Sequence, residues 1–348
     1  MRAVKALGIF IVILVLFLGS AITSSALAGQ FQEAVEAYQR GDYTTAIHLL
    51  RQLAEQGDAL AQHNLGLIYD LGHGVSRDPA EAVKWFRKAA AQGLAGAQYS
   101  LGLMYSRGEG VPQDKKEAAA WYRKAADQGY VQAQFNLGIL YLTGRGIPKD
   151  EKEAFNWFLK AADQGDTKAQ YNVGSLYAEG TGVERDYEKA FMWFQKAAIK
   201  GEPNSLNNIG HMYSEGLGVP KDDKRAFEYF QKSAALSHVT AQANLGDVYE
   251  EGKGVEQDYK QAFYWYHKAA MQGFPGAQFK LGAFYEKGLG NPQDYVKAHM
   301  WYNLVASSGD EKASDAANAR DKLAEKMTPE QIAEAQRLAR EWKPQQEN

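Results

Sequence analysis

The feature that most constrains the fold of this chain is a sequence pattern that recurs every 36 residues without insertion or deletion. A glycine, a tyrosine and an aspartate keep the same spacing in seven consecutive units, the first of which contains Gly66, Tyr69 and Asp78. A fixed period of this length is the signature of a repeat array, in which each unit buries its apolar face against its neighbours. The glycines of the pattern are Gly66, Gly102, Gly138, Gly174, Gly210, Gly246 and Gly282. A fourth column consists of Trp85, Trp121, Trp157, Trp193, Trp265 and Trp301, with Tyr229 in its remaining place.

Each unit is predicted to form a helical hairpin. In the first complete unit, apolar residues at helical spacing predict a first helix over residues 58–71, and Gly72 is expected to end it. Asp78 is expected to cap the second helix, because Glu81 follows it at the spacing of a capping box. Gly93 is expected to end that helix in the left-handed conformation. The sequence therefore predicts an all-α array of helix-turn-helix units.

Gly66 is expected in the middle of a helix, where glycine costs about 1 kcal/mol relative to alanine. The large side chains of Trp85 and Phe86 require small residues opposite them if the hairpin is to pack at interior density. We therefore interpret the glycine column as a packing column. An exposed tryptophan could stack on a sugar, but the position of Trp85 between Ala82 and Ala89 favours a place inside the hairpin.

Residues 1–28 have the features of an export signal. Arg2 and Lys5 provide a basic start, an apolar run follows over residues 7–18, and residues 26–28 form a small-x-small cleavage site. The run is shorter than the roughly 20 apolar residues that a membrane span needs. We therefore expect cleavage after Ala28 and a periplasmic or secreted protein, with an uncleaved membrane anchor as the alternative.

The rest of the chain is predicted to contain an N-terminal cap, seven repeats and a C-terminal cap. Residues 29–57 resemble a tetratricopeptide hairpin and are expected to cap the array. The predicted repeats span 58–93, 94–129, 130–165, 166–201, 202–237, 238–273 and 274–309. Residues 310–348 are expected to form capping helices over 311–325 and 329–342, followed by a tail.

Composition argues against several functions. The chain of 348 residues has a formal net charge of −3, which is unlike the basic footprint of a nucleic-acid-binding protein. It has no cysteine, which excludes disulfides, thiolate zinc sites and a cysteine nucleophile. Its seven histidines fall in different columns of the repeat, and no serine-nucleophile or phosphate-loop motif occurs. We therefore expect no catalytic residue, no metal and no cofactor, and predict that the protein is not an enzyme.

The repeated unit reads A-x-x-L-G-x-x-Y-x-x-G-x-G-V, then D, then A-x-x-W-F-x-K-A-A-x-Q-G. Over residues 58–309 it resembles the SEL-one-like repeat (SLR) of the tetratricopeptide-like superfamily, in its bacterial exported type. The resemblance implies a right-handed α-solenoid that binds other proteins in envelope assembly, signalling or host interaction. Some members of the family have been described as β-lactamases, but those are rich in cysteine. An envelope hydrolase of β-lactamase or cell-wall type is therefore the disfavoured alternative.

In tetratricopeptide-type stacks the first helices line a concave groove, which makes two columns candidates for partner binding. One column is asparagine in five of the seven units, and its amides would either contact the backbone of a partner or tie neighbouring repeats together. The other column, three residues later, varies between units, as expected of positions that set specificity. The candidate groove residues are Asn64, Asn136, Asn172, Asn208, Asn244, Leu67, Leu103, Ile139 and His211.

The fifth unit departs most from the others. Pro203 stands near its start, Tyr229 replaces the tryptophan, and Ser237 replaces the glycine that ends the second helix. These changes predict a bend or a softer joint near residues 201–210.

Overall fold

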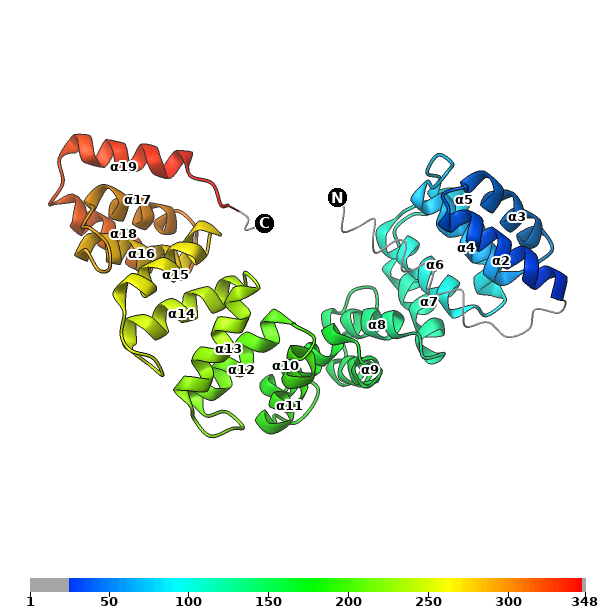
Figure 1. The fold of residues 1–348 in the computed structure, drawn as a ribbon, viewed down its shortest axis with the longest axis horizontal. Coiled ribbons are helices and arrows are strands. Elements are labelled where there is room, and N and C mark those ends of the chain that lie inside the picture. The colour runs from blue at the N-terminus through cyan, green and yellow to red at the C-terminus, as the bar shows by residue number, and fades with distance from the viewer. Residues whose placement is uncertain (1–24, 346–348) are drawn as a thin grey trace. The chain divides into compact units, whose positions relative to one another are not determined.

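The structure is a computed structural model that describes residues 25–345. These residues form eighteen α-helices, α2 to α19, and no β-strand (Figure 1). They divide into two compact units, one made of the described residues up to 169 with 181–184, the other of residues 170–180 with those from 185 onward. The predicted all-α solenoid class with its 36-residue period is confirmed.

The helices follow the predicted hairpins closely. An N-terminal hairpin consists of α2 (Ser25–Gln39) and α3 (Tyr43–Glu55). The first unit continues with α4 (Ala59–Leu71), α5 (Pro79–Ala91), α6 (Ala95–Arg107), α7 (Lys115–Asp127), α8 (Val131–Thr143) and α9 (Glu151–Asp163). Helix α10 (Thr167–Glu179) contributes residues to both units. The second unit continues with α11 (Tyr187–Ala198), α12 (Pro203–Glu215), α13 (Asp223–Ala235), α14 (Val239–Glu251), α15 (Tyr259–Met271), α16 (Pro275–Lys287), α17 (Tyr295–Ala306), α18 (Ala313–Ala324) and α19 (Pro329–Glu341).

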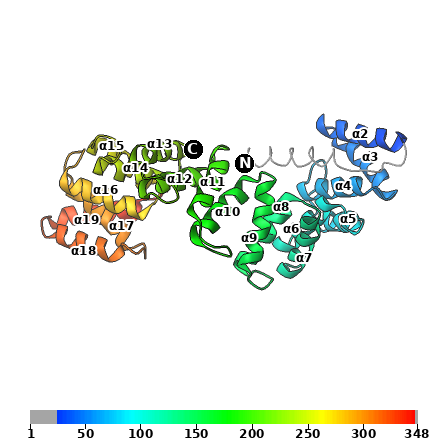
Figure 2. The ribbon, with the colours of Figure 1, turned by 90° about the horizontal axis from the view of Figure 1, so that it is seen from below.

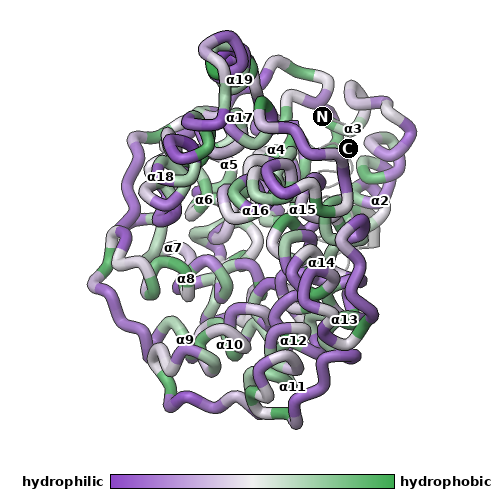
Figure 3. The backbone as a smooth tube through the Cα atoms, turned by 90° about the vertical axis from the view of Figure 1, so that its left-hand side faces the viewer, coloured by the Kyte–Doolittle hydropathy of each residue, from purple (hydrophilic) through white to green (hydrophobic). Residues whose placement is uncertain are grey.

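Within each unit the hairpins stack in chain order. From α2 to α9 and from α12 to α17, each first helix packs against the second helix of its own hairpin, and that second helix packs against the first helix of the next (Figures 1 and 2). At the C-terminal end, α18 and α19 both pack against α17. Hydrophobic and hydrophilic residues alternate along the helices (Figure 3), because one side of each helix faces its neighbours. The core is therefore a series of small clusters, such as the one that holds Phe86 and Leu101 and the one that holds Tyr122 and Leu137.

The predicted helix ends are present. A carboxylate oxygen of Asp78 accepts a hydrogen bond from the backbone N–H of Glu81 at 3.0 Å, and Gly93 has a φ of +89°. Thr328 caps α19 through a capping box with Gln331. The same N-cap bond recurs down the aspartate column, at Asp78, Asp114, Asp150, Asp186, Asp222, Asp258 and Asp294. The aspartate column therefore acts in helix capping.

One loop glycine in each hairpin has a second role that the sequence analysis missed. Gly110 has a φ of +67°, and a Cβ atom added to it would collide with the carbonyl oxygen of Pro79 in the preceding repeat. Each loop therefore docks on the hairpin before it. The equivalent glycines with their neighbours are Gly74 at Tyr43, Gly146 at Lys115, Gly182 at Glu151, Gly218 at Tyr187, Gly254 at Asp223 and Gly290 at Tyr259.

The predicted export signal lies almost wholly outside the described residues. Helix α2 begins at Ser25, and Leu27 of the predicted cleavage site packs against the N-terminal hydrophobic cluster. Cleavage after Ala28 stays a prediction. No helix within residues 25–345 is both long enough and apolar enough to cross a membrane.

Candidate partner-binding surface

One aromatic ring in each hairpin packs directly against the helix glycine and leaves no room for a side chain there. A Cβ atom added to Gly66 would lie 2.6 Å from Cδ1 of Phe86, which is closer than two carbon atoms can approach. The ring therefore comes from the residue after the tryptophan column, and not from Trp85 itself. The rings that meet the seven glycines are Phe86, Tyr122, Phe158, Phe194, Phe230, Tyr266 and Tyr302.

The tryptophan column lies at the junctions between hairpins, which differs from the expected place inside one hairpin. Trp85 is 7% exposed and belongs to a cluster that includes Leu50 and Leu53 of the preceding hairpin. The ammonium nitrogen of Lys88 lies 3.9 Å from the centroid of its ring and covers it. Trp85, Trp157, Trp193 and Trp301 are buried, whereas Trp121 and Trp265 are half-buried. A buried or lysine-covered ring is a poor surface for stacking on a sugar.

The asparagine column makes contacts within the array. The amide nitrogen of Asn64 donates to the carbonyl oxygen of Leu60 in its own helix at 2.8 Å. That of Asn244 donates to Oδ1 of Asn207 in the preceding repeat at 2.9 Å. The bond of Asn244 fits the alternative in which the amides tie repeats together, whereas buried Asn64 bonds only within its own helix. Asn172 and Asn208 are half-buried.

The variable column changes from buried and apolar in the first repeat to polar in the fourth, fifth and sixth repeats, and the seventh repeat has Ala283 there. Leu67 is only 9% exposed and belongs to the core of the first full hairpin, so it is removed from the candidate surface. Leu103 and Ile139 are half-buried, and His211 is exposed. Of the apolar residues in this column that the sequence analysis proposed, Leu103 and Ile139 thus keep accessible surface.

The aromatic residues beside this column belong to the hairpin interiors. The ring of Tyr99 lies 5.8 Å from that of Tyr122 and 5.1 Å from that of Tyr130, measured between centroids. Phe135 makes the same kind of contact with Phe158, at 5.6 Å. Tyr99 and Phe135 therefore pack inside their own hairpins, and Tyr99 also contacts Tyr130 of the next repeat.

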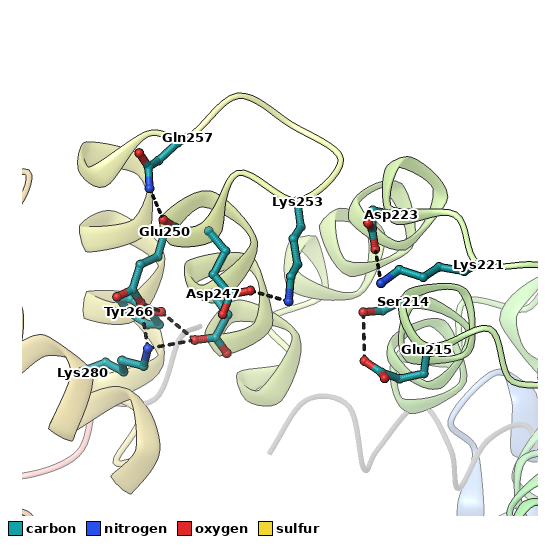
Figure 4. Close-up of polar contacts among 11 residues, drawn as sticks. Ser214, Glu215, Lys221, Asp223, Asp247, Glu250, Lys253, Gln257, Tyr266 and Lys280 are labelled. Carbon is teal, nitrogen blue, oxygen red and sulfur yellow. Dashed lines mark hydrogen bonds and ion pairs between the residues drawn. The ribbon is translucent and has the colours of Figure 1, made fainter.

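In the sixth repeat the variable column has a charged residue, Asp247. The hydroxyl group of Tyr266 lies 2.7 Å from Oδ1 of Asp247 and also bonds to Glu250. The ammonium group of Lys280 lies 2.8 Å from Glu250, so α16 is tied to α14 (Figure 4). Burial raises the pKa of Asp247, although 46% of its side chain remains exposed. The carboxyl groups of Asp247 and Glu250 thus accept from the same hydroxyl group, that of Tyr266.

Two of the histidines, His63 and His299, occupy buried packing positions. His63 is 1% exposed, its Nε2 atom lies 3.0 Å from the hydroxyl oxygen of Ser100 in the next repeat, and burial lowers its pKa to about 4. His299 is 2% exposed, and burial lowers its pKa as well. Within residues 25–345, no three His, Asp or Glu side chains are grouped so that they could hold a metal ion.

Comparison with sequence families gives one result. The family model of the Sel1 repeat matches residues 31–58, 59–94, 95–130, 131–166, 167–202, 203–238, 239–274 and 275–310. The match includes the N-terminal hairpin, which the sequence analysis separated from the repeats as a tetratricopeptide-like cap. A search of curated proteins gave no match.

Two solved structures are similar over most of their length. A Sel1 repeat protein from Oxalobacter formigenes is 35% identical, with a TM-score of 0.67 over 88% of this chain and 92% of that one. The protein c5321, a protective antigen of uropathogenic Escherichia coli strains with an SLR fold, is 30% identical, with a TM-score of 0.47 over 91% of this chain and 84% of that one.

Proposed function

This chain belongs to the Sel1 repeat family, and from that membership we propose that it is a non-enzymatic scaffold of the cell envelope or extracellular space that binds partner proteins along its first helices. Sel1 repeat proteins are generally protein-interaction scaffolds. The fold is typically non-catalytic. The partners would be envelope, signalling or host proteins.

The observation that carries this proposal is that the packing contacts are the same in every repeat, whereas one column of residues on the first helices varies between repeats. The ring-on-glycine contact is the same in all seven repeats, so it cannot distinguish one ligand from another. The column three residues after the asparagines instead changes from half-buried Leu103 and Ile139 to exposed His211 and to the charged Asp247. A groove lined by these side chains would bind a partner through side-chain pockets of different character along its length.

The proposed location rests on the sequence of the first 28 residues. A basic start, a short apolar run and a small-x-small site are the features of a secretory signal, which directs a protein out of the cytoplasm. In a Gram-negative cell the mature protein would be periplasmic or secreted. Fractionation, with the N-terminal residue determined by mass spectrometry, tests this part separately: a mature N-terminus at Gly29 is expected.

Affinity capture from an envelope extract tests the binding surface. We expect the double variant Leu103→Asp, Ile139→Asp to lose partners that the unchanged protein retains, because a charge on each side chain opposes burial in an apolar interface. Ala120→Asp is the matched control, since Ala120 is exposed on the second helix α7 of the same unit. Circular dichroism must show that all variants stay folded. Equal recovery of every partner by the double variant would place the binding site elsewhere.

A further inference from the structure

The most exposed large hydrophobic side chains of the second unit lie on its second helices. Ile199 at the end of α11 is 86% exposed, Met192 on the same helix is 57% exposed, and Leu236 at the end of α13 is 50% exposed. Met192 and Ile199 are seven residues apart and therefore share one side of α11. The positions equivalent to these two in the first unit are Lys84 and Ala91, Ala120 and Asp127, and Asn156 and Asp163. Contiguous apolar surface on a folded protein can mark a place of interaction, and Met192 and Ile199 are neighbours on α11.

The C-terminal ends of the second helices form one edge of the array, which we call the helix-end edge: residues 199–201, 235–237 and 271–273 in the fourth, fifth and sixth repeats. The C-terminal tail of the chain binds at this edge. In the sixth repeat the same edge is formed by residues 271–273, and the backbone N–H of Gln345 donates to the carbonyl oxygen of Met271 at 2.8 Å. A Cβ atom added to Gly273 would lie 3.4 Å from Pro344 and 3.8 Å from Trp342. Trp342 has an extended backbone, with φ −65° and ψ 141°. An extended segment with a tryptophan and a proline therefore covers this edge.

The edge continues from the sixth repeat to the fifth. The side-chain nitrogen of Gln272 lies 2.8 Å from the side-chain oxygen of Gln242 and 3.4 Å from the carbonyl oxygen of Ser237. The corresponding glutamine pair also joins α4 to α5, α6 to α7 and α8 to α9 in the first unit. The continuity means that a chain bound at Met271 could extend directly along the neighbouring helix ends.

In the fifth repeat this glutamine pair is absent, because Leu206 and Leu236 occupy its two positions. The exchange lowers the stability of the isolated chain in two ways, because a hydrogen bond is lost and the apolar side chain of Leu236 is left half exposed to water. Further along the edge, a Cβ atom added to Gly201 would meet no heavy atom within 4 Å. The edge is thus open at the fourth and fifth repeats, where it is also most apolar.

We propose that Ile199 and Leu236 form a docking site for an extended apolar segment of a partner protein, bound in the manner of residues 342–345 on the sixth repeat. The segment would place aromatic or proline side chains on these two residues and donate backbone N–H groups to the carbonyl groups at the helix ends. This site uses second helices and is separate from the first-helix surface.

A peptide with the sequence of residues 339–345, Ala-Arg-Glu-Trp-Lys-Pro-Gln, labelled with fluorescein, is the probe. We expect fluorescence anisotropy to show binding to the full chain, and the double variant Ile199→Lys, Leu236→Gln to bind at least tenfold more weakly. Glutamine at position 236 is the residue of most other repeats, so the fold is retained, as circular dichroism would verify. Ala91→Lys is the matched control, because exposed Ala91 is the equivalent of Ile199 in the first repeat.

The proposal is overturned if the unchanged protein does not bind the peptide, or if the double variant binds it equally well. Sedimentation equilibrium tests for a different occupant: a dimer of the unchanged protein that is lost in the double variant would assign the edge to a second copy of this chain. The Leu103→Asp, Ile139→Asp variant should bind the peptide normally. The peptide experiment therefore tests the docking site at Ile199 and Leu236 independently of the proposed first-helix surface.

Discussion

The helix glycines illustrate how one contact determines a residue. In the second repeat, a Cβ atom on Gly102 would lie 2.6 Å from Cδ1 of Tyr122. Alanine would gain about 1 kcal/mol of helix propensity, but overpacking of a core typically costs about 1–3 kcal/mol. We expect Gly102→Ala to lower the free energy of unfolding in urea. Ala120→Gly, at an exposed site of the same hairpin, measures propensity alone. A more stable Gly102→Ala protein would show that the ring moves freely.

His63 should make stability depend on pH. Its pKa is lowered from 6.5 to about 4 by burial, so the folded protein binds fewer protons than the unfolded chain between these values. Stability from this residue is therefore complete above pH 6.5 and falls as the pH drops toward 4, by about 2 kcal/mol at pH 5. His63→Phe should reduce the difference in unfolding free energy between pH 7.5 and pH 5. Phe135 occupies the same column, so the ring fits. An unchanged difference would assign the pH dependence to other groups.

At the scale of the helix, local signals predicted the elements well. The helix expected over residues 58–71 is Ala59–Leu71, and the one expected over 329–342 is Pro329–Glu341. Caps and glycines act within a few residues, so their effect can be predicted from the sequence. The contacts of Trp85, Gly110 and Asn244 could not be predicted in this way, because each depends on a neighbouring hairpin. The burial of Leu67, which removes it from the candidate site, has the same cause.

The end of α13 is strained by one residue. Ser237 has a φ of +59°, in the left-handed region where glycine is favoured, and it is the only residue other than glycine with a positive φ within residues 25–345. We expect Ser237→Gly to raise the free energy of unfolding by about 1 kcal/mol. Gly201→Ser is the reciprocal control, because Gly201 has a φ of +77° and open space around it. If the control does not lower stability, backbone strain is not the cause.

At the scale of the molecule, a repeat array is only as stable as the links between adjacent units. The fifth repeat has Leu206 and Leu236 in place of the glutamine pair that the first three repeats and the sixth repeat use. We expect amide hydrogen exchange at residues 201–210 to be faster than at residues 129–138 of the third repeat, because local opening requires fewer hydrogen bonds to break. Restoring both glutamines should slow it. Equal rates in the two segments would contradict the joint that the sequence analysis predicted.

The docking of each loop on the hairpin before it has a consequence for biosynthesis. The loop at Gly110 fits against Pro79, and Trp157 joins a cluster with Ala118 and Ala126, so in each case the later residue meets an earlier one. A nascent chain emerges N-terminus first. A hairpin that leaves the ribosome therefore finds the hairpin on which its loop docks already synthesised. Translation thus provides an order of assembly that runs from the N-terminal hairpin toward the C-terminal end.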